Sequence, residues 1–340
     1  MAVDSWLSAG PRGRRLCWSL LRERLPDPAW QQVWRHPAPA RAELAAALET
    51  ADLETLLGEH PEQVFLRALD EAVSSAMYWQ PPDPVDQVLA DPGCVALLAP
   101  FARAVAAASP IWWAEPVDLA TLRAVEYGEP LPTPAPELTA TADRLAAWRT
   151  AVREEEQRFK GYSSDVSGSW WSTPAHHHLP STTRALPELG ALALAFTEDR
   201  FGWTSARCHP LAPRRAVRVR EIDSAEDWIE MVNRYPLRVS DSRRYVWEQA
   251  TGEQATWLIP SFLDLSADYD GVHLSTRGYL ESAGRALRID EVWATVLAGW
   301  APDQTYWLTD CLAPTGEPRR WTTVEQGGPL DWIPAAADPT

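Results

Sequence analysis

The sequence predicts an α+β fold, in which a helical domain over residues 1–160 precedes a mixed α/β domain over residues 161–332 built around a sheet. Two observations predict this arrangement. Apolar residues recur at helical spacing before residue 160, whereas short apolar runs and apolar–charged alternation follow it. The length of 340 residues, 46% of them hydrophobic, suits two domains or one large one. Residues 333–340 are expected to form a loose tail.

Four segments of the first half have the apolar spacing of helices. They are residues 42–49, 61–73, 94–108 and 141–159. The second begins with Pro61, and proline is favoured at the first position of a helix. Residues 130–136 read Pro-Leu-Pro-Thr-Pro-Ala-Pro, which predicts a stiff, extended connector.

Strands and two helices are expected in the second half. Residues 191–196 form a short apolar run bounded by turn residues, which favours a buried strand, and residues 216–222 alternate as a half-buried strand does. Asp223 and Ser224, followed by acidic residues, begin a helix. Further strands are expected over 256–260, 271–275 and 305–309, and a short helix over 277–284.

The composition favours a cytoplasmic protein that binds neither membranes nor nucleic acid. The chain has no apolar run of about 18 residues, and its first residues lack the pattern of a secretory signal. A net charge of −16 repels nucleic acid phosphates. Lys160 is the single lysine among 31 basic residues, which indicates the coding bias of a GC-rich bacterial genome. Four scattered cysteines are interpreted as buried free thiols, and no metal or cofactor is specified.

Arginine is concentrated between residues 200 and 244, where ten arginines face six acids. Guanidinium groups bind phosphate or carboxylate through two-point contacts. The window therefore predicts a site for a small anionic ligand, with Arg218, Arg220, Arg243 and Arg244 as candidate clamps. The alternative interpretation is that these arginines pair with the abundant acids of the chain.

His273 and Ser275 are candidate site residues on one predicted strand. They would share a face of that strand, with Val272 and Leu274 on the other face. His273 is the candidate acid or base, and Ser275 a candidate ligand-binding residue. The alternative is that His273 is a buried core histidine.

Three short segments resemble a known catalytic layout. An arginine on a strand (Arg218 or Arg220), then Ser275-Thr276, then residues 304–306 follow the arginine, serine and glutamate order of ADP-ribosyltransferases. The resemblance covers residues 216–307. That family places its catalytic glutamate two residues after a glutamine or glutamate, and this sequence has Tyr306 there. The resemblance therefore implies that Asp303 would take the catalytic role.

Nineteen tryptophans are present, and most are expected to be core anchors. The adjacent pair Trp170-Trp171 is predicted to form a wall that stacks a planar ligand. Alternatively, this pair bridges the two halves of the chain. The histidines at 176–178 are interpreted as a solvated loop, because adjacent histidines cannot easily all face one metal ion.

Three functional hypotheses remain open. The first is an enzyme that binds an anionic, nucleotide-like ligand in the second half, with His273 and Asp303 as catalytic residues. The second is a non-enzymatic interaction or regulatory protein with an acidic surface and a protein partner, which the absence of common catalytic motifs suits. The third is an enzyme of a specialised bacterial pathway that acts on a hydrophobic substrate in a pocket lined by tryptophans. Convergence of the candidate residues on one concave site would favour the first hypothesis.

Overall fold

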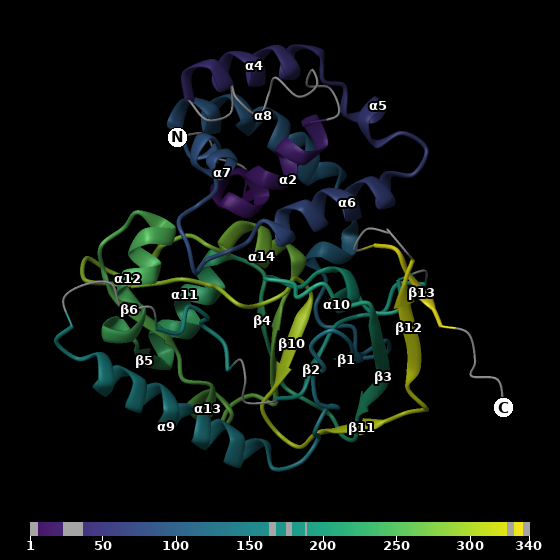
Figure 1. The fold of residues 1–340 in the computed structure, drawn as a ribbon, viewed down its shortest axis with the longest axis vertical. Helices are drawn as coiled ribbons and strands as arrows, with labels where there is room; N and C mark the ends of the chain where they lie inside the picture. The colour runs from purple at the N-terminus through teal and green to yellow at the C-terminus, as the bar shows by residue number, and fades with distance from the viewer. Residues whose placement is uncertain are drawn as a thin grey trace.

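The structure is a computed structural model, and it describes residues 6–22, 37–162, 168–174, 179–187, 189–324 and 330–335. Its fold is α+β, as the sequence predicts, with most helices in the first half and mixed sheets in the second. Figure 1 shows the N-terminal helices as a layer at one end of the sheets. Among the helices of the described segments, none has the length and apolar content that crossing a bilayer requires.

The helical layer is formed by the first part of the chain. Its elements are α1 (Trp6–Ala9), α2 (Pro11–Arg22), α4 (Pro37–Thr50), α5 (Leu53–Leu57), α6 (Pro61–Ser74), α7 (Pro84–Leu89), α8 (Pro92–Ala108) and the 3₁₀ helix η1 (Ile111–Ala114). The helices predicted over 42–49, 61–73 and 94–108 are confirmed as α4, α6 and α8.

Two arginines of α2 hold this layer together through ion pairs. Arg12 pairs with Asp86 of α7, and the two side chains are only 2% and 5% exposed. Arg15 pairs with Glu71 of α6 and with Asp83, which precedes α7, both at 2.8 Å. These pairs fix α2, α6 and α7 to one another, and removal of one buried partner would leave an uncompensated charge.

Beside the helical layer, the described residues form three small sheets. The first has the order β1 (Arg123–Tyr127), β3 (Ser205–Pro213), β12 (Arg319–Thr323), β13 (Trp332–Pro334), and β11 (Leu312–Pro314) also pairs with β3. The second has the order β2 (Ser181–Thr182), β10 (Gln304–Trp307), β7 (Gly271–Leu274), β4 (Val219–Ile222). The third has the order β5 (Pro236–Arg238), β6 (Thr256–Pro260), β9 (Trp293–Thr295), β8 (Leu287–Arg288).

Six further helices pack around these sheets: α9 (Thr141–Phe159), α10 (Leu192–Ala195), α11 (Ala225–Arg234), α12 (Ser240–Thr251), α13 (Phe262–Leu265) and α14 (Thr276–Ser282). The predicted helix over 141–159 is confirmed as α9, which packs against α12 and α13. Strand β1 pairs antiparallel with β3. Elements from before residue 160 thus contact elements from after it, and the domain boundary at residue 160 stays a prediction.

Most of the elements expected in the second half are found. The strands expected over 216–222, 256–260, 271–275 and 305–309 correspond to β4, β6, β7 and β10, and the two helices correspond to α11 and α14. The prediction of a strand over residues 191–196 is wrong, because Leu192–Ala195 forms α10. Alanine and leucine are strong helix formers, and a short apolar run has no period that separates strand from helix. In the expected tail, Ile333 and Pro334 belong to β13, and residues 336–340 lie outside the described segments.

Two glycines allow the helical layer to approach the second half. A Cβ atom at Gly10 would lie 2.4 Å from the carbonyl oxygen of Glu281 at the end of α14. Gly284 has φ +75°, and a Cβ atom there would lie 2.1 Å from the ring of Tyr78. Both contacts are too short for a side chain, so each position needs glycine.

Among the described residues, the largest hydrophobic core joins the helical layer to the second and third sheets, and two smaller clusters contain residues of the first sheet. Tryptophan provides the largest side chains of the buried interior. The tryptophans with less than 2% exposure are Trp18, Trp113, Trp148, Trp228, Trp247, Trp257, Trp300 and Trp307. The four cysteines are buried and free, as predicted. The burial of indole rings on both sides of residue 160 explains why so many tryptophans occur throughout the chain.

Ser224 caps α11, and its loss gives a first testable prediction. Its hydroxyl accepts a hydrogen bond from the backbone N–H of Asp227. We expect Ser224→Ala to lower the free energy of unfolding by about 1 kcal/mol, and Ser224→Gly by only a few tenths of that. Urea denaturation of both variants measures the difference. Equal losses in the two variants would contradict the capping role.

Candidate functional site

A cavity of about 460 Å³ lies where the first two sheets meet. Side chains of β1, β2 and β10 line it, together with residues from segments 170–171, 197–203 and 299–301. We call it the aromatic cavity, because its lining includes Tyr127, Trp170, Trp171, Phe201, Trp203, Trp300 and Tyr306. This volume lies within the usual range of small-molecule sites.

The rings of the aromatic cavity present both faces and edges. Tyr127 and Trp203 stack, with ring centroids 4.0 Å apart and planes 18° apart. Trp170 and Trp171 meet edge to face, with centroids 5.7 Å apart. The indole N–H of Trp203 donates to the carbonyl of Leu131 at 2.9 Å, which holds this ring in place. Such walls favour a ligand with a flat face.

Glu198 is the buried carboxyl group of this cavity, with 8% of its surface exposed. One carboxylate oxygen accepts from the Tyr279 hydroxyl at 2.9 Å, and the other accepts from the backbone N–H of Gly299 at 2.7 Å. Burial nevertheless raises the pKa of Glu198 to about 8, although both hydrogen bonds and the charge of Arg12 lower it. At neutral pH the group is therefore largely protonated and able to exchange a proton.

Other polar groups surround Glu198 in the lining. Arg123 of β1 donates to the carbonyl of Leu122 at 2.9 Å and has no carboxylate partner among the described residues. Asp199 has φ +52°, a conformation that costs a non-glycine residue about 1 kcal/mol and that is found in functional sites. Gln304 donates to the hydroxyl of Ser181 at 3.2 Å. The cavity thus offers one cation and several hydrogen-bonding groups beside the rings.

The two residues predicted as catalytic, His273 and Asp303, lie together in a buried polar cluster on the second sheet. His273 stands between Glu221 and Thr305 in the register of β4, β7 and β10, so the three share one face. The Nδ1 of His273 is 2.9 Å from the hydroxyl of Thr305. Its Nε2 is 3.9 Å from Asp303 and 4.0 Å from Glu221.

Arg184 ties Asp303 into this cluster. Its Nε and backbone N–H donate to the Asp303 carboxylate at 2.6 and 2.9 Å, and its Nη1 donates to Glu115 at 3.1 Å. Burial raises the pKa of Asp303 to about 6 against the charge of Arg184, and burial raises that of Glu221 to about 7. Burial, with the charge of Arg184, lowers the pKa of His273 to about 3. His273 is therefore neutral at physiological pH, and neither His273 nor Asp303 lines the aromatic cavity.

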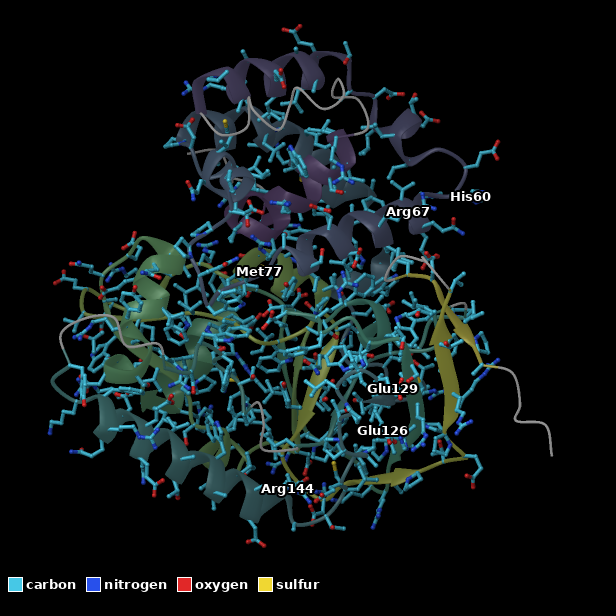
Figure 2. The ribbon with its side chains drawn as sticks, viewed as in Figure 1. His60, Arg67, Met77, Glu126, Glu129 and Arg144 are labelled. Atoms are coloured by element: carbon cyan, nitrogen blue, oxygen red, sulfur yellow. The ribbon has the colours of Figure 1, made fainter. Side chains whose placement is uncertain are left out.

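Most arginines of the 200–244 window form ion pairs with carboxylates of the chain. Arg207, for example, pairs at 2.9 Å with Glu126 of β1, which is labelled in Figure 2. The other pairs are Arg200–Asp70, Arg215–Asp270, Arg220–Glu230, Arg234–Asp268, Arg238–Asp241 and Arg243–Glu155. These ion pairs are what the alternative interpretation predicts, in which the arginines pair with the abundant acids of the chain.

The four candidate clamps do not converge. Arg218 is exposed before β4, and Arg220 extends from β4 toward α11. Arg243 is buried on α12, where its Nε donates to the carbonyl of Trp171 at 3.1 Å. Arg244 donates to the carbonyl of Tyr162 at 2.7 Å. None of the four lines the aromatic cavity, and their role in ligand binding stays a prediction.

Ser275 lies outside the strand on which it was expected. Strand β7 ends at Leu274, and Ser275 is the N-cap of α14, with its hydroxyl accepting from Gly278 and donating to Asp223 at 2.6 Å. The prediction that Ser275 shares a strand face with His273 is therefore wrong, because Ser275 caps the helix that begins at the next residue.

Trp170 and Trp171 both line the aromatic cavity. Trp170 also contacts the ring of Tyr78 from the helical layer, with centroids 6.4 Å apart. The pair thus reaches both the cavity and the first half of the chain. Its role as a stacking wall stays a prediction.

The main polar residues of the aromatic cavity were not predicted. Glu198 comes two residues after the run that was expected to be a strand, and Arg123 lies on a strand that the helical first half was not expected to contain. No local motif surrounds either residue. Their proximity arises from β1 pairing with β3 and from its bridge to Thr183, which are long-range contacts.

Within the described segments, no group of three or more His, Cys, Asp and Glu side chains is arranged to hold a metal ion. The histidines at 176–178 lie outside these segments. Comparison with known proteins found no family model, no curated protein and no solved structure that matches the chain.

Proposed function

We propose that this protein binds a ring-bearing small molecule in the aromatic cavity, and that Glu198 exchanges a proton with it as a general acid or base. The position of Glu198 carries the proposal. It is a buried carboxyl group beside aromatic rings, it lines a cavity, and its pKa of about 8 is close to neutral pH. A carboxyl group tuned in this way by an apolar site is a recurrent acid–base catalyst.

The rings and the hydrogen-bonding groups of the cavity favour a flat ligand with polar edges. The stacked pair of Tyr127 and Trp203 offers an aromatic surface on one side, and Trp171 lines the same space. Ser181 and Gln304 bring hydrogen-bonding groups to the lining. Nucleobases and other heterocycles have this combination of a flat face and a hydrogen-bonding edge.

The charge of the cavity limits the number of anionic groups on the ligand. Arg123 is the single basic residue of the described lining, and the chain as a whole has a net charge of −16. We therefore expect a nucleoside or a monophosphate, and not a triphosphate, to be the nucleotide-like ligand. The cytoplasmic location and bacterial origin are part of this proposal, and the four free cysteines agree with a reducing compartment.

Ligand titration of a tryptophan variant tests the cavity. The protein is screened by thermal shift and tryptophan fluorescence with nucleosides, nucleoside mono- and triphosphates, NAD and phosphorylated metabolites. We expect saturable binding of a heterocyclic ligand, weakened about tenfold or more in Trp203→Leu, since a stacking contact contributes about 1–3 kcal/mol. Trp293→Leu, outside this lining, is the matched control and should bind normally. No saturation by any ligand, or equal loss in both variants, would refute the proposal.

The pH dependence of binding tests the role of Glu198. For the ligand found in the screen, affinity in the wild type should change with a midpoint near pH 8, because the carboxyl group loses its proton there. Glu198→Gln should bind with no such transition and should abolish any conversion of the ligand. Binding without conversion or pH dependence in the wild type would instead favour the non-enzymatic hypothesis.

A further inference from the structure

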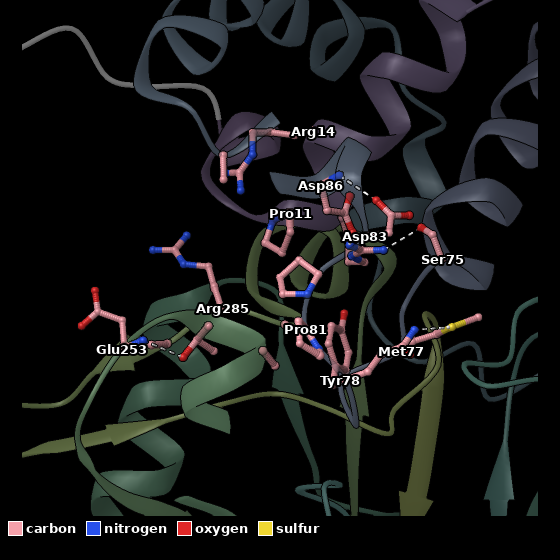
Figure 3. Close-up of a pocket in the computed structure, with 18 residues that line it drawn as sticks. Pro11, Arg14, Ser75, Met77, Tyr78, Pro81, Asp83, Asp86, Glu253 and Arg285 are labelled. Carbon is pink, nitrogen blue, oxygen red and sulfur yellow. Dashed lines mark hydrogen bonds and ion pairs between the residues drawn. The ribbon is translucent and has the colours of Figure 1, made fainter. Parts of the chain in front are cut away.

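A second cavity, of about 300 Å³, lies between the helical layer and the second half (Figure 3). Its lining comes from α2, from the segment that joins α6 to α7, from the end of α12 and from residues 284–286. We call it the arginine cavity, because Arg12, Arg14 and Arg285 line it. It is separate from the aromatic cavity in its lining residues.

The carboxylates in this lining already have arginine partners. Asp83 pairs with Arg15 at 2.8 Å, and Glu253 pairs with Arg288 at 2.7 Å. Asp86 pairs with Arg12, as described above. None of these acids therefore remains to neutralise the two other arginines of the cavity.

Arg14 and Arg285 have no ion pair among the described residues. Arg14 donates to the carbonyls of Ser8 and Ala9, both at 3.0 Å, and Arg285 donates to the carbonyl of Glu281 at 3.3 Å. In Figure 3 the side chain of Arg14, from α2 in the helical layer, lies above that of Arg285, which follows α14 in the second half.

Arg14 is a largely buried cation with two arginines near it. Burial, with the charges of Arg12 and Arg285, lowers the pKa of Arg14 to about 10, although Asp86 opposes this shift. An anion placed between these groups would remove the repulsion that they exert on one another.

Two hydrogen-bond donors of the arginines in this cavity also lack an acceptor within the described segments. The Nε–H groups of Arg12 and Arg14 are buried without a hydrogen-bond acceptor among the described residues. A buried donor without an acceptor costs about 1–3 kcal/mol. A ligand that places acceptor oxygens within reach of these groups would remove that cost.

We propose that the arginine cavity binds a small organic molecule through an oxyanion group, either phosphate or carboxylate, held by Arg14 and Arg285. Planar guanidinium groups match both oxyanions in geometry and charge. Pro11, Pro81 and Met77 supply an apolar surface for the organic part of the molecule. The ligand would connect α2 with the segment after α14, and its binding would stabilise the contact between the helical layer and the second half.

Isothermal titration calorimetry on the full chain tests this site. Inorganic phosphate, ribose 5-phosphate and succinate are titrated separately at one ionic strength. We expect at least one of them to saturate, with an affinity at least tenfold weaker in Arg285→Gln and in Arg14→Gln. Saturation by the phosphates identifies a phosphate site, and saturation by succinate identifies a carboxylate site.

Two control variants make the result specific. Arg238→Gln removes an arginine whose carboxylate partner, Asp241, lies outside the lining of this cavity, and it should bind like the wild type. Trp203→Leu alters only the aromatic cavity and should also leave this binding unchanged. Absence of saturation with all three probes overturns the proposal, as does an affinity in Arg285→Gln equal to that of the wild type.

Discussion

Replacing Asp86 with alanine should lower the free energy of unfolding by about 3–5 kcal/mol, because it leaves a buried charge without its partner. The Arg12 guanidinium is 2% exposed and pairs with Asp86, which itself is 5% exposed. Urea denaturation followed by circular dichroism measures the loss.

Glu253→Ala is the matched control for this prediction. It also removes an arginine's carboxylate partner, but Arg288 and Glu253 are 43% and 51% exposed. We expect that variant to lose no more than about 1 kcal/mol. The double variant Arg12→Met, Asp86→Leu should be less destabilised than Asp86→Ala, since it buries no charge. Similar losses in Asp86→Ala and Glu253→Ala would show that burial of Arg12 does not set the cost.

The stability of the wild type relative to Glu198→Gln should fall between pH 5 and pH 9. Burial raises the pKa of Glu198 from 4.5 to about 8, so in this window the folded state holds a proton that the unfolded state has released. The free energy of unfolding of the wild type therefore decreases as pH rises, and the glutamine variant lacks this contribution. A shift of one pKa unit corresponds to about 1.4 kcal/mol. We therefore expect the difference in free energy of unfolding between the wild type and Glu198→Gln to change by about 2–4 kcal/mol from pH 5 to pH 9.

Paired denaturation curves at pH 5, 7 and 9 measure this effect. Other groups with raised pKa values, such as Asp303 and Glu221, are present in both proteins and cancel in the difference. Glu230→Gln, whose side chain is 66% exposed in its pair with Arg220, should show no such trend. A constant difference between wild type and Glu198→Gln would mean that Glu198 is ionised throughout this range.

Local sequence patterns predicted the fold class and six of the helices that the structure describes, because spacing and capping act within a few residues. Ser224, with its early acids, marked the start of α11 in this way. Residues 191–196 were misassigned because a six-residue apolar run suits either a strand or a helix. Strand β1 was missed because its place in the first sheet depends on pairing with β3, about 80 residues away.

The candidate site was predicted only in part. Some of its features are visible in the local sequence, whereas others arise from contacts between residues that are far apart in the chain. Trp170 and Trp171 were found because large aromatic side chains are conspicuous in any sequence, and the same holds for the arginine window. Several of the carboxylates that pair with those arginines are distant in sequence, as with Arg200 and Asp70. Glu198 differs from other acids of the chain through its burial, which only the folded chain creates.

The approach of Gly284 to Tyr78 has a consequence for how this sequence can diverge. A Cβ atom at residue 284 would lie 2.1 Å from the Tyr78 ring, while that ring lies between the arginine cavity and Trp170. A change at either position alone would create a clash or a gap, so the two residues should be inherited as a pair. Homologues that keep an aromatic residue at position 78 should keep glycine at 284, and a side chain at 284 should appear only where residue 78 has become small.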